Sequence, residues 1–212
     1  VLCSVGKYLS TGVFSRQVSV AQCLICEAGF WAGAGADSCV ACAKGKYLGD
    51  GGITASEHDS ESRCKICSSG EYADKAGSNS CNKCVRGQYL SNPASDASLH
   101  DSQSDCVTCS SGSYAETEGK SMCTPCETGR FLSDDGNVAI SHDSENDCVV
   151  CKMGTIATNL GLSVCTTCSA GRYLEDEGTL STLHDNTEDC LVCGPGKWSL
   201  EKSNGCSNCE AG

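Results

Sequence analysis

The chain has 212 residues, 21 of them cysteine, and a net charge of −12 from 27 acidic and 15 basic side chains. This acidic balance argues against nucleic acid and anionic membrane surfaces as partners, and no apolar stretch approaches the length of a membrane span. Leu, Ile, Val and Phe together make up less than a fifth of the residues, so the chain either stays disordered or is held together by covalent bonds between its cysteines.

Cysteine pairs of the form C-x-x-C recur along the chain and set its period. They begin at Cys23, Cys39, Cys64, Cys81, Cys106, Cys123, Cys148, Cys165, Cys190 and Cys206. From Cys64 onwards every second pair follows after 42 residues, and a period of this length is typical of tandem repeats. We therefore predict a partial repeat over 1–22, repeats over 23–63, 64–105, 106–147 and 148–189, and a partial repeat over 190–212.

Two further positions follow the cysteines in register. A glycine stands three residues after the second cysteine of each pair, and an aromatic residue stands five residues after it, with Ile156 as the exception. Cys3, followed by Gly6 and Tyr8, obeys the same rule, so we interpret the chain as a window on a longer array. We predict structural roles for Gly45, Tyr47, Gly70, Tyr72, Gly87, Tyr89, Gly112, Tyr114, Gly129, Phe131, Gly171 and Tyr173.

Long and short half-repeats alternate. In the long halves a leucine follows the aromatic residue, and a turn signal and a His-Asp-Ser or His-Asp-Asn run come before the next cysteine. The first long half, Leu9–Gln22, is shorter and has Gln17-Val18-Ser19 in place of that run. The run Gly45-Lys46-Tyr47-Leu48 predicts a strand of two to four residues after a turn, and the Asp-Ser-Glu segments predict a single helical turn capped by Asp or Ser. No stretch has the apolar periodicity of an α-helix.

The cysteine spacing fits either disulfides or zinc, because two C-x-x-C pairs such as those from Cys64 to Cys84 are also a zinc signal. We favour disulfides, since the chain is acidic and since a ladder from the second cysteine of one pair to the first of the next accounts for the odd count. This ladder is Cys3–Cys23, Cys26–Cys39, Cys42–Cys64, Cys67–Cys81, Cys84–Cys106, Cys109–Cys123, Cys126–Cys148, Cys151–Cys165, Cys168–Cys190 and Cys193–Cys206. Cys209 would then pair beyond the fragment. First-to-third pairing within two adjacent pairs remains the alternative.

The segment from Cys42 to Tyr72, with Gly45, Tyr47 and the C-x-x-C pair at Cys64, resembles the cysteine-rich repeats of tumour necrosis factor receptors. It is more similar to the ephrin-receptor-like cysteine-rich repeats of large extracellular proteins. The pairing known in the receptor family agrees with the ladder, but the chain lacks the extra cysteine pair that those receptors carry in the long loop. We predict a small disulfide-rich fold, mostly irregular with short β-strands, arranged as an elongated tandem-repeat rod.

Other motifs suggest chemistry but have simpler interpretations. The four His-Asp pairs, at His58, His100, His142 and His184, suit metal binding or a pH switch, but we favour turns in which Asp accepts backbone N–H bonds and His packs beside a disulfide. Acidic spots such as Asp134-Asp135 lack the spaced ligands of a calcium loop. Ten equivalent C-x-x-C pairs indicate structure rather than redox catalysis. We predict no catalytic residue, no cofactor and no metal.

These observations predict a non-enzymatic, secreted or cell-surface structural protein: a stiff array forming a stalk, matrix element or fibre subunit. Its expected partners are further copies of itself or other extracellular proteins and glycans, with O-linked sugars on exposed Ser and Thr as a hypothesis. A receptor or adhesion ectodomain that binds a protein ligand is the main alternative. An intracellular zinc scaffold is the third reading.

Overall fold

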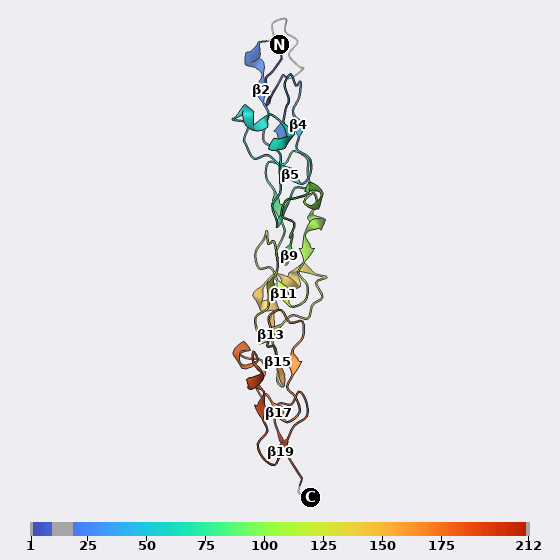
Figure 1. Ribbon diagram of the computed structural model, residues 1–212, viewed down its shortest axis with the longest axis vertical. Helices are drawn as coiled ribbons and strands as arrows, with labels where there is room; N and C mark the ends of the chain where they lie inside the picture. The colour runs from blue at the N-terminus through green and yellow to red at the C-terminus, as the bar shows by residue number, and fades with distance from the viewer. Residues whose placement is uncertain (1, 10–18, 211–212) are drawn as a thin grey trace. The chain divides into compact units, whose positions relative to one another are not determined.

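The computed structural model describes residues 2–9 and 19–210 (Figure 1). The short first loop that the sequence sets apart therefore lies largely outside the described residues, as does Gly212. The chain divides into two compact units: Val1–Cys84 with Leu90–Val107, and Val85–Tyr89 with Thr108–Gly212. The repeat boundaries given by the cysteine period remain a prediction.

In the first unit the strands are two residues long and pair in chain order into antiparallel hairpins, β1 with β2 and so on to β7 with β8. They are β1 (Lys7–Tyr8), β2 (Leu24–Ile25), β3 (Phe30–Trp31), β4 (Val40–Ala41), β5 (Lys46–Tyr47), β6 (Lys65–Ile66), β7 (Glu71–Tyr72) and β8 (Asn82–Lys83). The strands β9 (Gln88–Tyr89) and β10 (Val107–Thr108) fall where the sequence passes between the units.

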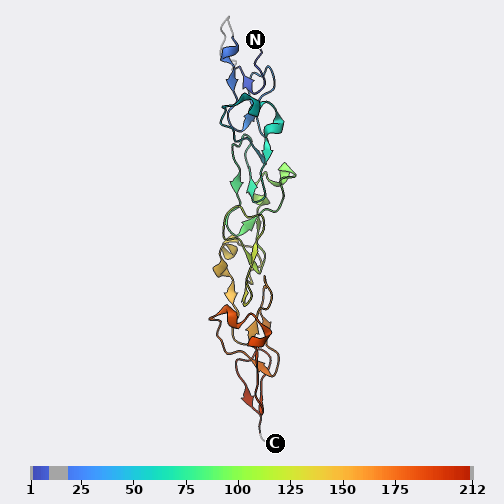
Figure 2. The ribbon, with the colours of Figure 1, turned by 60° about the vertical axis from the view of Figure 1, so that its left-hand side comes forward.

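The second unit repeats this pattern, from β11 paired with β12 to β19 paired with β20. Its strands are β11 (Ser113–Tyr114), β12 (Thr124–Pro125), β13 (Arg130–Phe131), β14 (Val149–Val150), β15 (Thr155–Ile156), β16 (Thr166–Thr167), β17 (Arg172–Tyr173), β18 (Leu191–Val192), β19 (Lys197–Trp198) and β20 (Ser207–Asn208). In Figures 1 and 2 every strand is a short arrow between stretches of irregular loop.

The helices of the described residues are 3-10 turns of three or four residues. They are η1 (Val20–Gln22), η2 (Ala55–His58), η3 (Glu61–Arg63), η4 (Ala97–Leu99), η5 (Gln103–Asp105), η6 (Ala139–His142), η7 (Glu145–Asp147), η8 (Ser181–Leu183) and η9 (Thr187–Asp189). The predicted helical turn before each cysteine is confirmed at η3, η5, η7 and η9, and Ser102 and Ser144 cap two of them. The turns that end at or just before each histidine, such as η2 and η6, were not predicted.

Each hairpin starts at the glycine that follows a cysteine pair. Gly45 has a φ of 77°, in the left-handed region, and the N–H of Lys46 donates to the carbonyl of Ala43. The chain then leaves the turn as β5, in register with β6 through Tyr47 and Lys65. A glycine is required there because a side chain is strained at such a φ.

Among the described residues, no common core runs through either unit. The buried apolar residues form separate small clusters, each built around one disulfide, such as Tyr72 and Leu90 with Cys84 and Cys106. The fold is therefore a small disulfide-rich one with short antiparallel strands and a sequential ladder of ten disulfides, which confirms the predicted class. Covalent bonds take the place of a large apolar interior.

Candidate functional site: the joint between successive loops

The disulfides divide the chain into loops of two lengths. Ten bridges join the same cysteines as the favoured ladder: Cys3–Cys23, Cys26–Cys39, Cys42–Cys64, Cys67–Cys81, Cys84–Cys106, Cys109–Cys123, Cys126–Cys148, Cys151–Cys165, Cys168–Cys190 and Cys193–Cys206. We call a loop long where the bridge spans 20 or 22 residues, as in Cys42–Cys64, and short where it spans 13 or 14, as in Cys67–Cys81. These bridges leave Cys209 as an exposed free thiol.

Gly45, which follows the cysteine pair at Cys39 and Cys42, joins its own long loop to the next two loops. The N–H of Gly45 donates to the carbonyl of Ala73 in the next short loop, at 2.8 Å, and the carbonyl of Gly45 accepts from Cys67 at 3.0 Å. The Cα of Gly45 faces the carbonyl of Ala97 in the following long loop, and a Cβ built there would lie 2.0 Å from that oxygen. Contacts therefore extend beyond the adjacent loop, which the sequence did not predict.

The same arrangement recurs at other glycines. A Cβ on Gly87 would lie 2.0 Å from the carbonyl of Ala139, and a Cβ on Gly129 would lie 2.0 Å from that of Ser181. Gly87 and Gly129 also donate to Ala115 and Ala157 of the next short loops, as Gly45 does to Ala73. A small residue after each short-loop aromatic thus lies at the joint, where its carbonyl accepts a bond from the preceding long loop.

The aromatic residue of each short loop packs on the disulfide of the next long loop. Tyr114 is buried with Leu132 and the Cys126–Cys148 bridge. Ile156, the exception to the aromatic pattern, fills the equivalent place with Leu174 and the Cys168–Cys190 bridge. The position therefore requires a large apolar side chain rather than an aromatic ring.

The aromatic residues of the long loops behave differently. Tyr47, Tyr89, Phe131 and Tyr173 are only half-buried, and Trp198 of the last short loop is 45 % exposed. The aromatic residues of the long loops are therefore less completely buried than Tyr72 and Tyr114 of the short loops. Their hairpins leave part of each ring accessible to solvent, beside the residue across the strand, such as Lys65 opposite Tyr47.

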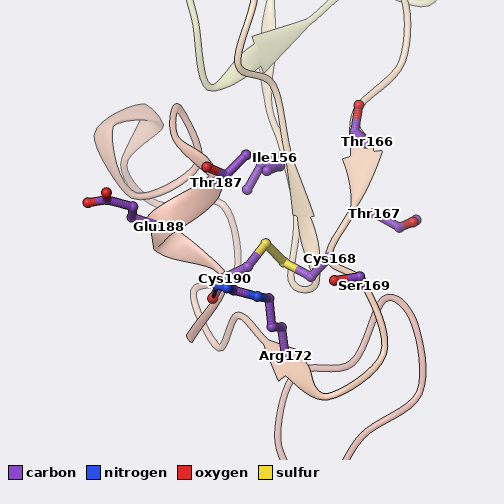
Figure 3. A pocket seen from close by; sticks show the side chains of 9 residues that line it. All are labelled: Ile156, Thr166, Thr167, Cys168, Ser169, Arg172, Thr187, Glu188 and Cys190. Atoms are coloured by element: carbon purple, nitrogen blue, oxygen red, sulfur yellow. Dashed lines mark hydrogen bonds between the residues drawn. A yellow bond between two sulfur atoms is a disulfide. The ribbon is translucent and has the colours of Figure 1, made fainter. Parts of the chain in front are cut away.

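Open hollows lie beside these joints. One of them, of about 320 Å³, is lined by the Cys168–Cys190 bridge, Ile156 and hydroxyl groups that include those of Thr166 and Thr187 (Figure 3). Arg172 at its floor donates from Nη1 to the carbonyl of Cys190, at 2.8 Å. One N–H of the guanidinium is therefore engaged in holding the long loop closed.

A fully buried histidine joins each complete long loop to the short loop before it. These residues are His58, His100, His142 and His184, each with no exposed surface. His58 Nδ1 lies 2.6 Å from the carbonyl oxygen of Phe30, and the carbonyl of His58 accepts from the N–H of Ala32 at 2.9 Å. The carbonyl of Phe30 and the N–H of Ala32 face away from β4. The histidine therefore bonds to the unpaired edge of the β3–β4 hairpin.

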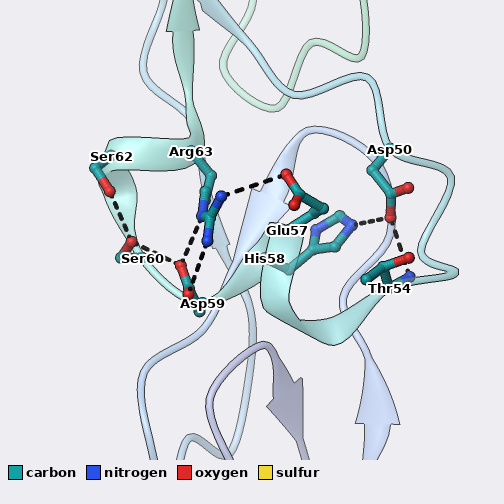
Figure 4. A network of polar contacts seen from close by, with 8 residues as sticks. All are labelled: Asp50, Thr54, Glu57, His58, Asp59, Ser60, Ser62 and Arg63. Carbon is teal, nitrogen blue, oxygen red and sulfur yellow. Dashed lines mark hydrogen bonds and ion pairs between the residues drawn. The ribbon is translucent and has the colours of Figure 1, made fainter.

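The other ring nitrogen faces a side chain eight residues earlier in the same long loop. His58 Nε2 lies 2.9 Å from Oδ2 of Asp50, which also accepts from the N–H groups of Ile53 and Thr54 (Figure 4). The bonds from His58 and Thr54 hold the pKa of the Asp50 carboxyl below its usual value of 3.8. Asp134 and Asp176 take the same place for His142 and His184, and Asn92 takes it for His100.

This partner was missed from the sequence. The aspartate that directly follows each histidine was expected to close the turn, but Asp59 instead binds Arg63 and accepts from the Ser60 hydroxyl (Figure 4). A signal was present, because Asp or Asn stands eight residues before every one of the four histidines. In the described part of the chain no three His, Cys, Asp or Glu side chains are grouped so that they could hold a metal ion.

Comparison with known families and proteins adds one match. The family model described as tyrosine-protein kinase ephrin type A/B receptor-like matches residues 52–98. A search of curated proteins found no match. None of the helices in residues 2–9 and 19–210 has the length and apolar character needed to cross a membrane. The chain is therefore similar to the ephrin-receptor-like family over residues 52–98, and its ten disulfides are typical of extracellular proteins.

Proposed function

We propose that the chain is a non-enzymatic spacer of an extracellular protein, a stiff array that forms a stalk, matrix element or fibre subunit. The family match and the disulfides support an extracellular setting. The proposal includes the repeat boundaries 23–63, 64–105, 106–147 and 148–189. It also includes further copies of the array, or other extracellular proteins and glycans, as partners.

The recurrence of one joint is the observation that carries this proposal. Gly45, Gly87 and Gly129 each donate to the small residue of the next short loop and each meet a carbonyl of the following long loop. A protein whose loops are joined by the same backbone contacts resists bending at every joint alike. Such uniformity suits a mechanical or spacing role, in which no single loop needs to differ from the others.

A receptor or adhesion ectodomain is the second candidate, and one surface favours it. A hollow of about 470 Å³ in the first unit is lined by half-buried Tyr47 and by Asp50, Glu57 and Arg63. Tyrosine and arginine side chains that are accessible to solvent are common anchors of protein interfaces. This candidate predicts that Tyr47→Ala and Arg63→Ala abolish binding to cells or to an extracellular protein while the disulfides stay intact.

Electron microscopy of the full-length protein, purified from its source without reductant, distinguishes the two functions. Long uniform filaments, or uniform stalks within a larger assembly, are expected for a spacer. Single flexible rods that end in a globular head or a membrane anchor would overturn it in favour of the receptor or adhesion reading. A sample treated with reductant is the control, because a ladder held by disulfides should lose its regular form.

A further inference from the structure

Both ring nitrogens of the buried histidines face oxygen atoms. For His142, Nδ1 lies 2.7 Å from the carbonyl oxygen of Ser113 and Nε2 lies 2.9 Å from Oδ1 of Asp134. For His184, the corresponding distances are 2.7 Å to Thr155 and 2.9 Å to Asp176. A carbonyl oxygen has no proton to donate, so Nδ1 must carry one. In a neutral imidazole, Nε2 would then carry a lone pair instead of a proton. This lone pair would face the negatively charged carboxylate, and the two would repel each other.

The carboxylates are themselves held in the ionised form. Asp176 accepts from the N–H of Gly178, and from the N–H and hydroxyl of Thr179, at 2.6–2.9 Å. A carboxyl group that accepts this many bonds is stabilised as the anion, so it does not supply the proton for Nε2. The ring must therefore supply it, and both ring nitrogens must be protonated.

We propose that His58, His142 and His184 are held as imidazolium cations, and that each closes its joint by a buried ion pair which opens when the proton is lost. The folded joint then binds one more proton than the opened joint. The sign follows from linkage: such a joint is most stable at lower pH and weakens as pH rises. The array thus carries a protonation-dependent clamp at three of its joints.

The groups around these clamps favour a cation. On the segments packed around each histidine the carboxylates outnumber the cations, and the arginines there bind other groups. Arg63 binds Asp59 and Glu57, and Arg130 and Arg172 donate to carbonyl oxygens. The charged groups of the two loops that each histidine joins are Glu27, Asp37, Lys44, Lys46, Asp50, Glu57, Asp59, Glu61 and Arg63 for His58; Glu116, Glu118, Lys120, Glu127, Arg130, Asp134, Asp135, Asp143, Glu145 and Asp147 for His142; and Lys152, Arg172, Glu175, Asp176, Glu177, Asp185, Glu188 and Asp189 for His184.

The fourth joint provides an internal control. His100 has Asn92 in place of the aspartate, with Oδ1 at 3.0 Å from Nε2. Oδ1 of Asn92 also accepts from the N–H of Ser95, at 3.2 Å, but an uncharged amide forms no ion pair, so this side chain does not stabilise a cationic ring as a carboxylate does. The proposal therefore assigns the clamp to the three aspartate-paired histidines and leaves His100 neutral.

The first test is a long-range ¹H–¹⁵N spectrum of the histidine rings in the oxidised 212-residue chain at pH 7.5. Only four histidines contribute, so the spectrum is simple. Two protonated nitrogens are expected for His58, His142 and His184, and one for His100. A single proton on the aspartate-paired rings would overturn the proposal, and a second proton on His100 would show that the carboxylate is not what holds the cation.

The second test uses the amides that donate to the histidine carbonyls. Ala32, Ala115 and Ala157 donate to His58, His142 and His184, whereas Ala73 donates to His100. Protection of the first three amides against hydrogen exchange should fall by up to about ten-fold per pH unit above neutrality, beyond the intrinsic rate, as expected for the loss of one proton. Protection at Ala73 should not show this additional fall.

A reciprocal pair of variants separates the clamp from a merely structural role. Asp134→Asn should remove the additional pH dependence at Ala115, and Asn92→Asp should create it at Ala73. The two variants interchange the residues found at equivalent places, so both side chains fit the loop. If the pH dependence stays unchanged in both variants, the ion pair does not control the joints.

Discussion

At the scale of single residues, glycine is the most constrained position in the chain. Gly129 has a φ of 79° and its Cα lies against the carbonyl of Ser181. Gly171 has a φ of 82°, but among the described residues no atom lies within 4 Å of the place where a Cβ would sit. The two positions therefore separate the strain of the backbone from the clash at the joint.

Gly129→Ala should destabilise the joint by about 2–5 kcal/mol, because left-handed strain and overpacking add. In the 212-residue chain, which does not include the position 52 residues after Gly171, Gly171→Ala should cost only the strain, about 1–2 kcal/mol. Amide exchange in the loops on either side measures both free energies of opening. Equal costs for the two variants would show that the contact with Ser181 contributes nothing.

The histidine clamp shows where sequence reasoning ends. The cysteine, glycine and aromatic positions were predictable because each has a fixed spacing and a single physical requirement. The partner of His58 was missed although Asp or Asn stands eight residues before each histidine, because the residues around it differ between repeats, as in Asp50-Gly51-Gly52 and Asn92-Pro93, and do not say which side chain turns inward. The usual chemistry of turns favoured the adjacent Asp59 as the residue that closes the turn. In the structure the buried ring of His58 instead binds Asp50, eight residues earlier.

At the scale of elements, the apolar contact between a short loop and the next disulfide decides stability. Ile156→Ala removes the side chain that covers the Cys168–Cys190 bridge and should cost about 2–5 kcal/mol. The bridge should then be reduced faster by dithiothreitol, as followed by alkylation and mass spectrometry. Ile156→Tyr is the matched control, since Tyr72 and Tyr114 occupy the same place in other loops.

The aspartate-centred turns of the long loops predict how the elements respond to acid. The pKa of Asp134 is lowered by its bonds from His142 and the N–H of Gly136, and that of Asp176 by its bonds from Thr179 and His184. A carboxyl whose pKa is lower in the folded state stabilises the fold above its unfolded pKa and loses that effect as pH falls through the folded value.

These turns should therefore stay closed at pH 5 and loosen only below the ordinary carboxyl value of 3.8. Amide exchange at Gly136 and Gly178, which donate to the two aspartates, measures this opening. Asp176→Asn should remove the acid dependence at Gly178 while leaving it at Gly136. An opening that begins well above pH 5 would contradict the lowered pKa values.

At the scale of the whole molecule, the disulfides carry the stability that a large core would otherwise supply. Cysteines make up much of every apolar cluster, and each bridge closes a loop worth about 3 kcal/mol in the chain-entropy description. Complete reduction should therefore unfold both units. Circular dichroism and amide exchange before and after reduction test this, and persistent protection in the reduced chain would contradict it.

The contact between each glycine and a carbonyl two loops further on also bears on how the chain is made. Gly45, Gly87 and Gly129 each touch a residue 52 positions later. During synthesis, a joint can therefore be completed only after about one and a quarter repeats more have left the ribosome. A growing chain therefore carries a trailing segment of glycines without their contacts and cysteines without their partners, and we expect the disulfides to form in order from the N-terminal end.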